Sequence, residues 1–356
     1  MKSARVLLSG YYGFDNAGDE AVLAGLVLAL NQIKTGPLSI NVLSNDPNGT
    51  RNDHGVSAAH RYKPLQLLKS IGRCDLLMSG GGSLLQDVTS AHSVFYYLAV
   101  VRIAQMLHKK TMFAAQGIGP LNLVRSRKLV ASVAQRLDRI TVRDQDSKLL
   151  LQQIGVTKQE IFVTADPAIL LGSIDSGIAA GTVAVALRPW QDFAIGNITA
   201  ASLKQSTFKG NLIPIAMQPD TDKPVMEQFL SEMHQTKQSD HKELIEAGHH
   251  RLPAIIKSLA QCEMVVGMRL HALILAAASG VPSVAIGYDP KVASFMSATG
   301  QGDAWCDLNQ LNQSEFAEVI SHCWENRTDR RNALIARLPA LQESALRTAE
   351  IALDLV

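Results

Sequence analysis

Residues 263–291 read EMVVGMRLHALILAAASGVPSVAIGYDPK, and the pattern of apolar and charged residues in this stretch decides the expected fold. The apolar segments predict a buried strand, an apolar helix, a turn at Gly280-Val281-Pro282 and a second buried strand. Arg269 and His271 stand in the loop after the first strand, and Lys291 stands in the loop after the second. Cationic groups confined to the loops of such a unit indicate an anion-binding site.

The same alternation of strand and helix runs through the rest of the chain. The other expected strands cover residues 5–9, 39–43, 75–79, 111–116, 140–143, 161–165, 182–187 and 211–217. Helices are expected to begin near Asp19, Ser83, Val124, Asp144 and Val225. This alternation predicts an α/β protein in which doubly wound parallel sheets carry helices on both faces.

A segment rich in glycine, serine and alanine, residues 171–181, divides this pattern into two halves. We therefore expect two Rossmann-like domains, residues 1–175 and 176–356, which agrees with a length of 356 residues. The polar segment 239–250 is expected to be an insertion or a loop. A last amphipathic helix is expected over residues 331–356, broken by Pro339.

The composition excludes several classes of protein. A net charge of +2, 5% aromatic residues and no long block of like charges argue against a nucleic-acid partner. The apolar segment near the N-terminus is too short for a signal sequence or a membrane span, so we expect a cytoplasmic protein and leave contact with the inner face of the cell membrane open. Four widely spaced cysteines lack any C-x-x-C pair and are expected to be thiols in a reducing compartment.

The loop at residues 10–20, GYYGFDNAGDE, follows the first strand and has the spacing G-x2-G-x4-G. The dinucleotide fingerprint G-x-G-x-x-G is therefore absent, and no nicotinamide cofactor is expected. Asp19 is the expected helix N-cap, which makes a tight, capped turn one interpretation of the loop. The other is a binding loop in which Asn16, Asp19 and Glu20 hold sugar hydroxyls.

Two further glycine loops and an arginine also follow expected strands. The segment Gly80–Asp87, GGGSLLQD, combines glycines with an expected helix start, and Gly117-Ile118-Gly119 follows the next strand. Close packing of helix on sheet is the alternative to ligand binding for both loops. Arg143 fits either a surface ion pair or a guanidinium fork for a carboxylate or phosphate.

The interpretation as an anion site is stronger for Arg269, His271 and Lys291 together than for any one of them. A lone histidine before an apolar helix is usually structural, but two fixed cations and an imidazole on neighbouring parallel strands suit a phosphate and a proton donor. No metal is expected, because no H-E-x-x-H motif occurs and His249-His250 has no metal-ligand spacing. Ligands of doubly wound domains bind outside the carboxyl ends of the strands, so all these loops are expected to converge between the domains.

The motifs, taken in order, resemble the polysaccharide pyruvyl transferase family, and within it the CsaB-type branch. They are GYYGFDNAGDEA (10–21), GGGSLLQD, AQGIGP, VRDxxS (142–147), ADPA (165–168) and MRLHALILAAASGVPSVAIGYDPK (268–291). The resemblance implies a GT-B-like fold whose last helix returns to the first domain. It also implies transfer of the enolpyruvyl unit of phosphoenolpyruvate onto a sugar as a ketal, a 4,6-ketal on β-N-acetylmannosamine of a cell-wall polysaccharide precursor in this branch.

The resemblance also implies roles for individual residues. Arg143 and Arg269 would hold the carboxylate and phosphate of phosphoenolpyruvate, Lys291 would neutralise the leaving phosphate, and His271 would be the acid or a phosphate ligand. The implied substrate-binding residues are Gly13, Asn16, Asp19, Glu20, Gly81, Gly82, Asp87 and Gln116. Asp19 and Asp87 are candidates for the base that activates the sugar.

Two other functions and several properties stay open at this point. One function is a nucleotide-sugar glycosyltransferase on the same scaffold, and the other is a non-catalytic sugar-binding homologue. No cofactor beyond the donor substrate is expected. The implied partners are phosphoenolpyruvate and an amino-sugar glycan, with a lipid carrier and a homo-oligomer both left open.

Overall fold

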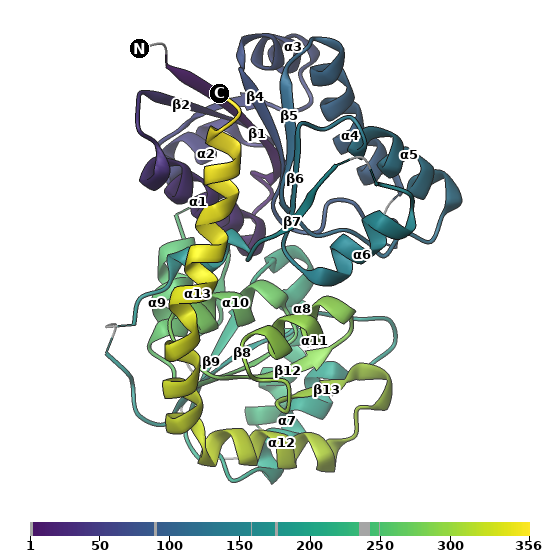
Figure 1. Cartoon of the computed structure of the whole chain (residues 1–356). Coiled ribbons are helices and arrows are strands. Elements are labelled where there is room, and N and C mark those ends of the chain that lie inside the picture. The colour runs from purple at the N-terminus through teal and green to yellow at the C-terminus, as the bar shows by residue number, and fades with distance from the viewer. Residues whose placement is uncertain (1–2, 89–90, 158, 175–176, 235–242, 249) are drawn as a thin grey trace. The chain divides into compact units, whose positions relative to one another are not determined.

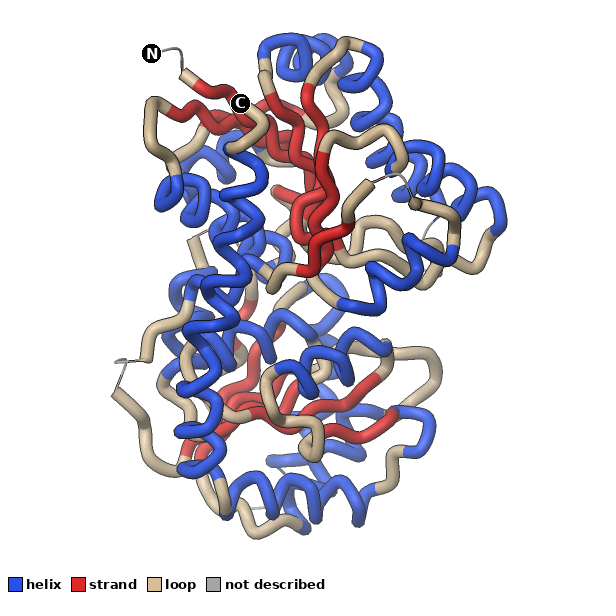
Figure 2. The backbone as a smooth tube through the Cα atoms, viewed as in Figure 1, coloured by secondary structure: helices blue, strands red, loops and turns tan. Residues whose placement is uncertain are grey.

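A computed structural model of the protein describes residues 3–88, 91–157, 159–174, 177–234, 243–248 and 250–356 (Figure 1). The chain forms two compact units. Unit 1 contains Met1–Phe14, Asp19–Leu170 and Leu341–Val356, and unit 2 contains Asp15–Gly18 and Leu171–Ala340. The first domain was expected to end at residue 175, five residues after Leu170, where the main segment of unit 1 ends. Figure 2 shows strands and helices in each unit.

Unit 1 is built on a parallel sheet of seven strands in the order β3-β2-β1-β4-β5-β6-β7. The strands are β1 (Ala4–Tyr12), β2 (Leu38–Ser44), β3 (Ser57–His60), β4 (Leu76–Gly80), β5 (Lys110–Gln116), β6 (Arg139–Val142) and β7 (Ile161–Val163). Val6 of β1 pairs with Ile40 of β2 on one side and with Leu76 of β4 on the other. The chain therefore winds outward in both directions from β1, as in doubly wound folds.

Helices cover both faces of this sheet. They are α1 (Ala17–Ile33), α2 (Pro47–His54), α3 (Pro64–Arg73), α4 (Ala91–Met106), α5 (Val124–Ala134), α6 (Gln145–Gln153) and the end of α13 (Arg327–Leu353). One core joins the sheet to α3–α6 through side chains such as Ile71, Leu98 and Val130. A second core, which includes Leu26 and Ala349, joins the opposite face to α1 and α13.

Unit 2 repeats this plan with six parallel strands in the order β10-β9-β8-β11-β12-β13. They are β8 (Thr182–Ala186), β9 (Asn211–Ala216), β10 (Ile245–Glu246), β11 (Met264–Gly267), β12 (Ser283–Gly287) and β13 (Trp305–Asp307). Its helices are α7 (Ile195–Gln205), α8 (Pro219–His234), α9 (Leu252–Ala260), α10 (Leu270–Ala278), α11 (Pro290–Ala298) and α12 (Gln313–Glu325). Short 3-10 helices cover Pro167–Leu171 and Leu308–Gln310. The expected α/β class with doubly wound sheets is confirmed.

The last helix contradicts one expectation and confirms another. Helix α13 continues through Pro339, where the sequence predicts a break. A proline inside a helix removes one hydrogen bond, and tertiary packing on both sides outweighs that loss here, since Leu334 and Leu338 before it and Ala345 after it are buried. Leu341–Val356 belongs to unit 1, so the helix returns to the first unit as expected.

Three local expectations are wrong. No helix starts at Ser83, because residues 81–88 form a loop that the Leu85–Ile118 bridge ties to the neighbouring loop, and α4 begins at Ala91. Asn16 lies at the start of α1, where its side chain accepts a hydrogen bond from the Gly18 amide at 3.0 Å, so the cap is not Asp19. Helix α8 begins at Pro219 and not near Val225, because Asp222 accepts hydrogen bonds at its first turn.

Two predictions based on composition can also be compared with the structure. All four cysteines are free thiols, and burial raises the pKa of Cys74 and of Cys306 to about 11 and that of Cys323 to about 12. Within the described ranges, no helix is both long and apolar enough to cross a membrane. The polar segment 239–250 falls partly outside those ranges, which omit residues 235–242 and 249.

Candidate functional site

Each sheet has one position where the direction of winding reverses. In unit 1 this position lies between β1 and β4, and in unit 2 between β8 and β11. The loops at the carboxyl ends of two such strands diverge to opposite faces of the sheet, which opens a crevice where α/β proteins bind ligands. The sequence-predicted residues lie in these loops and in those of the next strands.

In unit 2, Arg269 follows β11 and stands at the N-cap position of α10. Its Nε donates to both carboxylate oxygens of Asp222 at 3.0 and 3.1 Å, and Nη2 donates to the same carboxylate and to the Thr221 hydroxyl at 2.8 Å. The Arg269 side chain is 12% exposed and the Asp222 side chain is fully buried. The guanidinium is therefore held in a fixed orientation by a carboxylate below it.

Asp222 lies in the first turn of α8. Its carboxylate both binds Arg269 and accepts the amide of Gln218 at 2.9 Å. A buried carboxylate requires such partners, since an unpaired buried charge is costly. The signal in the sequence was the acidic pair Asp220 and Asp222 at the start of α8.

His271 lies in the first turn of α10, two residues after Arg269. Its ring rests against Gly18, where an added Cβ atom would come within 2.3 Å of Nδ1 and 2.7 Å of Cγ. The glycine loop after β1 and the Arg269–His271 loop are thus brought together within unit 2, which contains Asp15–Gly18. The backbone amide of Ala17 donates to the Met217 carbonyl at 2.8 Å and fixes this contact.

Lys291 lies in the first turn of α11, directly after Pro290. Asp289 caps this helix by accepting the Lys291 amide at 3.0 Å, and Lys291 itself is 8% exposed. Strands β11 and β12 are paired, so α10 and α11 begin at the same edge of the sheet. Arg269, His271 and Lys291 therefore stand at the N-termini of two neighbouring helices, where the helix dipoles also favour an anion.

Sequence reasoning missed an aromatic cluster at the same edge of unit 2. Trp190 follows β8 and Tyr288 follows β12, and their rings lie 4.7 Å apart between centroids. The Arg188 guanidinium lies 5.2 Å from the Trp190 ring and 4.9 Å from the Tyr288 ring, and it donates to the Tyr288 hydroxyl at 3.2 Å. Aromatic residues in the loops that follow two buried strands were the signal that would have found this cluster.

In unit 1, Arg143 follows β6 and is almost completely buried, with a side chain 4% exposed. It donates to Asp166 at 2.9 Å and to the Ser83 hydroxyl at 2.7 Å. The surface ion pair considered for Arg143 is therefore wrong, because the pair is buried and its main acid is Asp166. Each of the two predicted arginines is thus held by a carboxylate from a neighbouring segment of its own unit.

One group of neighbouring residues lies at the carboxyl edge of the unit 1 sheet and consists of Asp19, Gly82, Gln116 and Arg143. A Cβ atom on Gly82, which has φ of +75°, would lie 2.7 Å from Asp19 Oδ1. The Gln116 amide donates to the Gly82 carbonyl at 3.1 Å, and its Oε1 is buried with no hydrogen-bond partner among the described residues. A Cβ atom on Gly117 would lie 2.9 Å from Nε of Arg143.

The other sugar candidates hold the loops of unit 1. Glu20 accepts the Gly13 amide at 2.7 Å and pairs with His54 at 2.8 Å. Asp87 accepts the amides of Asn122 at 2.7 Å and Leu123 at 2.9 Å. Its partial burial opposes ionisation, but these amides, the Ser126 hydroxyl and the charge of Arg127 together lower the pKa of Asp87. Gly81 adopts φ of +82°, which lets the loop after β4 turn sharply.

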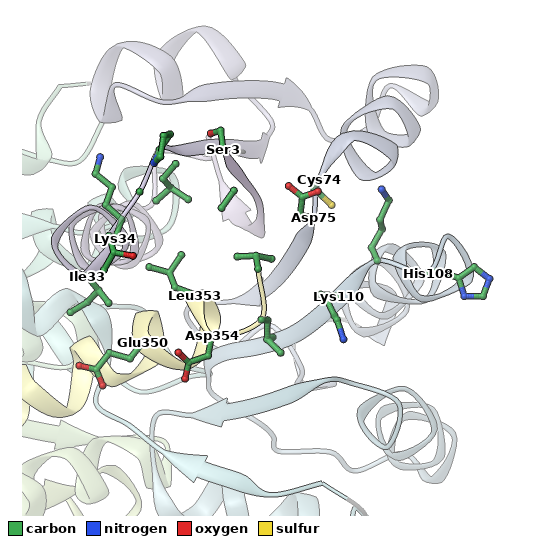
Figure 3. A pocket seen from close by; sticks show the side chains of 18 residues that line it. Ser3, Ile33, Lys34, Cys74, Asp75, His108, Lys110, Glu350, Leu353 and Asp354 are labelled. Atoms are coloured by element: carbon green, nitrogen blue, oxygen red, sulfur yellow. The ribbon is translucent and has the colours of Figure 1, made fainter. Parts of the chain in front are cut away.

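One cavity lies elsewhere in unit 1 (Figure 3). It has a volume of about 630 Å³ and is lined at the amino-terminal ends of the strands by residues such as Ala4, Leu38 and Lys110, together with Glu350 and Asp354 of the C-terminal segment. Its lysines and acids are mixed, so it has no preference for one charge. Across the described ranges, no cluster of three or more His, Cys, Asp or Glu side chains has a geometry that suits a metal ion.

Fold and site define a two-domain α/β protein of the GT-B type, and known structures agree. HepE of Anabaena in complex with UDP-glucose is 13% identical, with a TM-score of 0.64 over 99% of this chain and 98% of that one. UDP-GlcNAc 2-epimerase of Neisseria meningitidis bound to UDP-GlcNAc is 11% identical, with a TM-score of 0.62 over 99% of both chains. At such identities the likeness concerns the fold.

The family model for polysaccharide pyruvyl transferases matches residues 16–290. The chain belongs to this family, so the predicted resemblance to the family is confirmed. The amylovoran biosynthesis protein AmsJ of Erwinia amylovora is 20% identical over an alignment that covers 90% of this chain and 92% of that protein. The protein is therefore a pyruvyl transferase and is similar to a protein of polysaccharide biosynthesis.

Proposed function

We propose that the protein transfers the enolpyruvyl group of phosphoenolpyruvate onto a sugar of a cell-wall polysaccharide precursor as a ketal and releases phosphate. The acceptor of this proposal is β-N-acetylmannosamine, which would carry a 4,6-ketal as in the CsaB-type branch. Family membership over residues 16–290 gives the class of reaction. The observation that carries the proposal is the set of Arg269, His271 and Lys291 at two neighbouring helix N-termini, which suits a doubly charged phosphate ester.

The reaction makes demands that these groups meet. A proton is added to C3 of the donor, cationic character develops at C2, and one sugar hydroxyl adds to C2 and loses its proton. The bond between C2 and the phosphate oxygen then breaks and phosphate leaves with the electron pair. The second hydroxyl adds to C2 and closes the ketal, and its proton goes to the released phosphate. Preorganised cations stabilise the charge of the departing phosphate, which is the step that Lys291 and Arg269 would accelerate.

His271 is the group in unit 2 that is suited to move the proton. Its ring is positioned on one side by Gly18, and it follows Arg269 in the same turn. An imidazole can both donate and accept a proton, as a general acid must. The same position also fits a ligand of the phosphate, and a pH-rate profile separates these two roles.

Unit 1 offers groups that suit sugar hydroxyls and the donor carboxylate. Asp19 and Gln116 lie beside Gly82 at the edge of the sheet, and the Gln116 Oε1 lacks a partner among the described residues. A hydroxyl that donates to this oxygen would satisfy a buried acceptor, which supports a polar ligand here. Arg143, oriented by Asp166 and Ser83, is the guanidinium of this unit for a carboxylate.

Phosphate release tests this proposal. The protein is incubated with phosphoenolpyruvate and a panel of glycans that end in β-N-acetylmannosamine, and free phosphate is measured with and without acceptor. We expect release that depends on the acceptor and requires neither NAD nor a divalent metal. Binding of a nucleotide sugar, with no phosphate release across the panel, would support a glycosyltransferase and refute the proposal.

A further inference from the structure

The charge of the chain is distributed unevenly along the sequence. Residues 61–137 contain eleven lysines and arginines but two acids, Asp75 and Asp87, which gives this segment a net charge of +9. The whole chain has a net charge of +2, so the remaining residues sum to −7. The low net charge of the whole chain therefore does not reveal this strongly basic segment. The segment includes α3, α4 and α5 of unit 1.

Neither acid of the segment neutralises the outer surface of these helices. Asp75 lies just before β4 and pairs with Arg5 of β1 at 2.6 Å. Asp87 accepts two backbone amides of the loop that leads into α5. The basic side chains on the helices therefore have no acids of their own segment to pair with across the helical layer.

The three helices form one layer on the same face of the unit 1 sheet (Figure 1). Tyr62, just before α3, lies 5.6 Å from Tyr96 of α4 between ring centroids. The Arg125 guanidinium of α5 lies 5.8 Å from the Phe95 ring of α4. The exposed sides of α3, α4 and α5 therefore adjoin one another, and we call them the α3–α5 surface.

Apolar side chains are exposed on this surface to an unusual degree. Leu65 is 85% exposed, Val124 is 63% exposed and Leu68 is 47% exposed. Nine of the fifteen exposed large hydrophobic residues of the described ranges fall between residues 62 and 124. Exposed apolar side chains that gather on neighbouring helices of one domain are typical of an interaction surface. Many of these side chains lie near the starts of the helices, at the edge of the sheet that carries the site.

Basic residues surround the apolar ones. Lys63 and Lys69 flank Leu65 and Leu68 on α3, and each is exposed. On α5, exposed Arg125, Arg127 and Lys128 follow Leu123 and Val124. Leucine, valine and phenylalanine side chains that insert between lipid headgroups, with lysine and arginine at headgroup level, define an interfacial membrane contact.

We propose that the α3–α5 surface docks on an anionic lipid bilayer. The phosphate backbone of a nucleic acid would pair with the basic residues but would not bury the exposed aliphatic side chains. A bilayer interface binds both kinds of side chain. The proposal concerns where the protein works and does not depend on pyruvyl transfer. It places the sheet edge with Asp19 and Gln116 on the same side of unit 1 as the apolar residues that would enter the headgroup region.

Co-sedimentation with lipid vesicles tests the proposal on the full chain. Vesicles of phosphatidylcholine alone are compared with vesicles that also contain phosphatidylglycerol. We expect binding to the anionic vesicles that weakens with salt and little binding to the neutral ones. Because each basic side chain near an anionic surface contributes about fivefold to partitioning, Lys63→Glu/Lys69→Glu is expected to weaken binding at least about 25-fold.

The apolar contribution has its own variant and controls. Leu65→Ser/Leu68→Ser is expected to weaken binding at least about tenfold, since both leucines would enter the interface. Ile178→Ser and Lys257→Glu, at exposed positions of unit 2, should bind as the unmodified protein does. Absence of binding, equal binding to neutral vesicles, or loss in the control variants would refute the proposal. So would a leucine variant that binds normally, or single-stranded DNA that binds as tightly as the vesicles.

Discussion

Gly18 and His271 are in direct contact, and the contact requires a glycine. A Cβ atom at residue 18 would lie 2.3 Å from Nδ1 of the His271 ring, which is closer than any real Cβ contact. Gly18 is in the first turn of α1, where alanine would otherwise be preferred by about 1 kcal/mol. The last glycine of the G-x2-G-x4-G loop is therefore explained by the imidazole that rests on it.

Gly18→Ala is predicted to lower turnover at least about tenfold, because the added methyl group displaces the ring of a residue proposed to transfer a proton, and small displacements are costly in catalysis. Gly72→Ala is the matched control, since Gly72 also lies in a helix and nothing stands within 4 Å of an added Cβ atom. Steady-state rates of phosphate release from both variants check this. Equal rates in the two variants would show that the contact between Gly18 and His271 does not contribute to catalysis.

His271→Ala and Lys291→Ala are each predicted to lower kcat at least about 100-fold, the scale for loss of a proton-transfer or preorganised electrostatic group. Lys257→Ala, on the exposed side of α9, serves as a control for loss of a lysine. A proton donor would also shift the pH-rate profile when it is replaced, whereas a phosphate ligand would mainly affect KM. A wild-type rate in either variant excludes that residue from the site.

Asp222→Ala is predicted to destabilise the protein by about 3–5 kcal/mol, because it removes the buried negative charge that pairs with the Arg269 guanidinium. The double variant Arg269→Ala/Asp222→Ala should be less destabilised than the sum of the two single variants. Asp303→Ala is the comparison, since Asp303 pairs with Arg330 but is 59% exposed, and it should cost less than about 1 kcal/mol. Urea unfolding measures all four, and strict additivity of the Arg269 and Asp222 effects would contradict the coupling.

The stability contributed by Asp87 should depend on pH. Desolvation opposes ionisation of Asp87, but the amides of Asn122 and Leu123, the Ser126 hydroxyl and the charge of Arg127 together lower its pKa in the folded protein below the ordinary value of about 3.9. A lowered folded pKa means that the contribution is present above about pH 4 and is lost as the pH falls through the folded pKa. Asp87→Asn should therefore be less stable than the unmodified protein at pH 7, with a difference that shrinks below about pH 4. A difference that stays constant over this range in unfolding experiments would contradict the argument.

Chelation is predicted to leave phosphate release unchanged, because the proposed electrostatic groups are arginine, lysine and histidine side chains. The enzyme is assayed with phosphoenolpyruvate and acceptor before and after exhaustive treatment with EDTA, and again with NAD added. A rate that collapses with EDTA and returns with a divalent metal would show that the phosphate is held by a metal ion instead.

Much of the fold could be predicted from the sequence because buried parallel strands form short apolar runs bounded by turn residues. The predicted strands at 39–43, 111–116 and 182–187 differ from β2, β5 and β8 by at most one residue at either end. The segment from α2 to α3 was not anticipated, since PNGTRNDH has no apolar periodicity and β3 is a short edge strand. The expected break at Pro339 failed because packing outweighed a local preference.

The site was less predictable, for a physical reason. Arg143 and Arg269 stand out in the sequence because they follow apolar strands, but their carboxylate partners lie 23 and 47 positions away in the chain. Only the folded chain shows that Asp166 and Asp222 orient them. Glu20 and Asp87, which were predicted to bind the sugar, also accept hydrogen bonds from loop amides, and residue type alone does not reveal this role.

In the proposed reaction, phosphoenolpyruvate donates its enolpyruvyl group to a sugar. Mass spectrometry of acceptor glycans ending in β-N-acetylmannosamine, after incubation with the protein and phosphoenolpyruvate, detects this transfer. We predict a product with the mass of the acceptor plus one pyruvyl ketal, formed with release of phosphate and strongly reduced with His271→Ala. Acceptors that keep their original mass across the panel, while the protein remains folded, would contradict it.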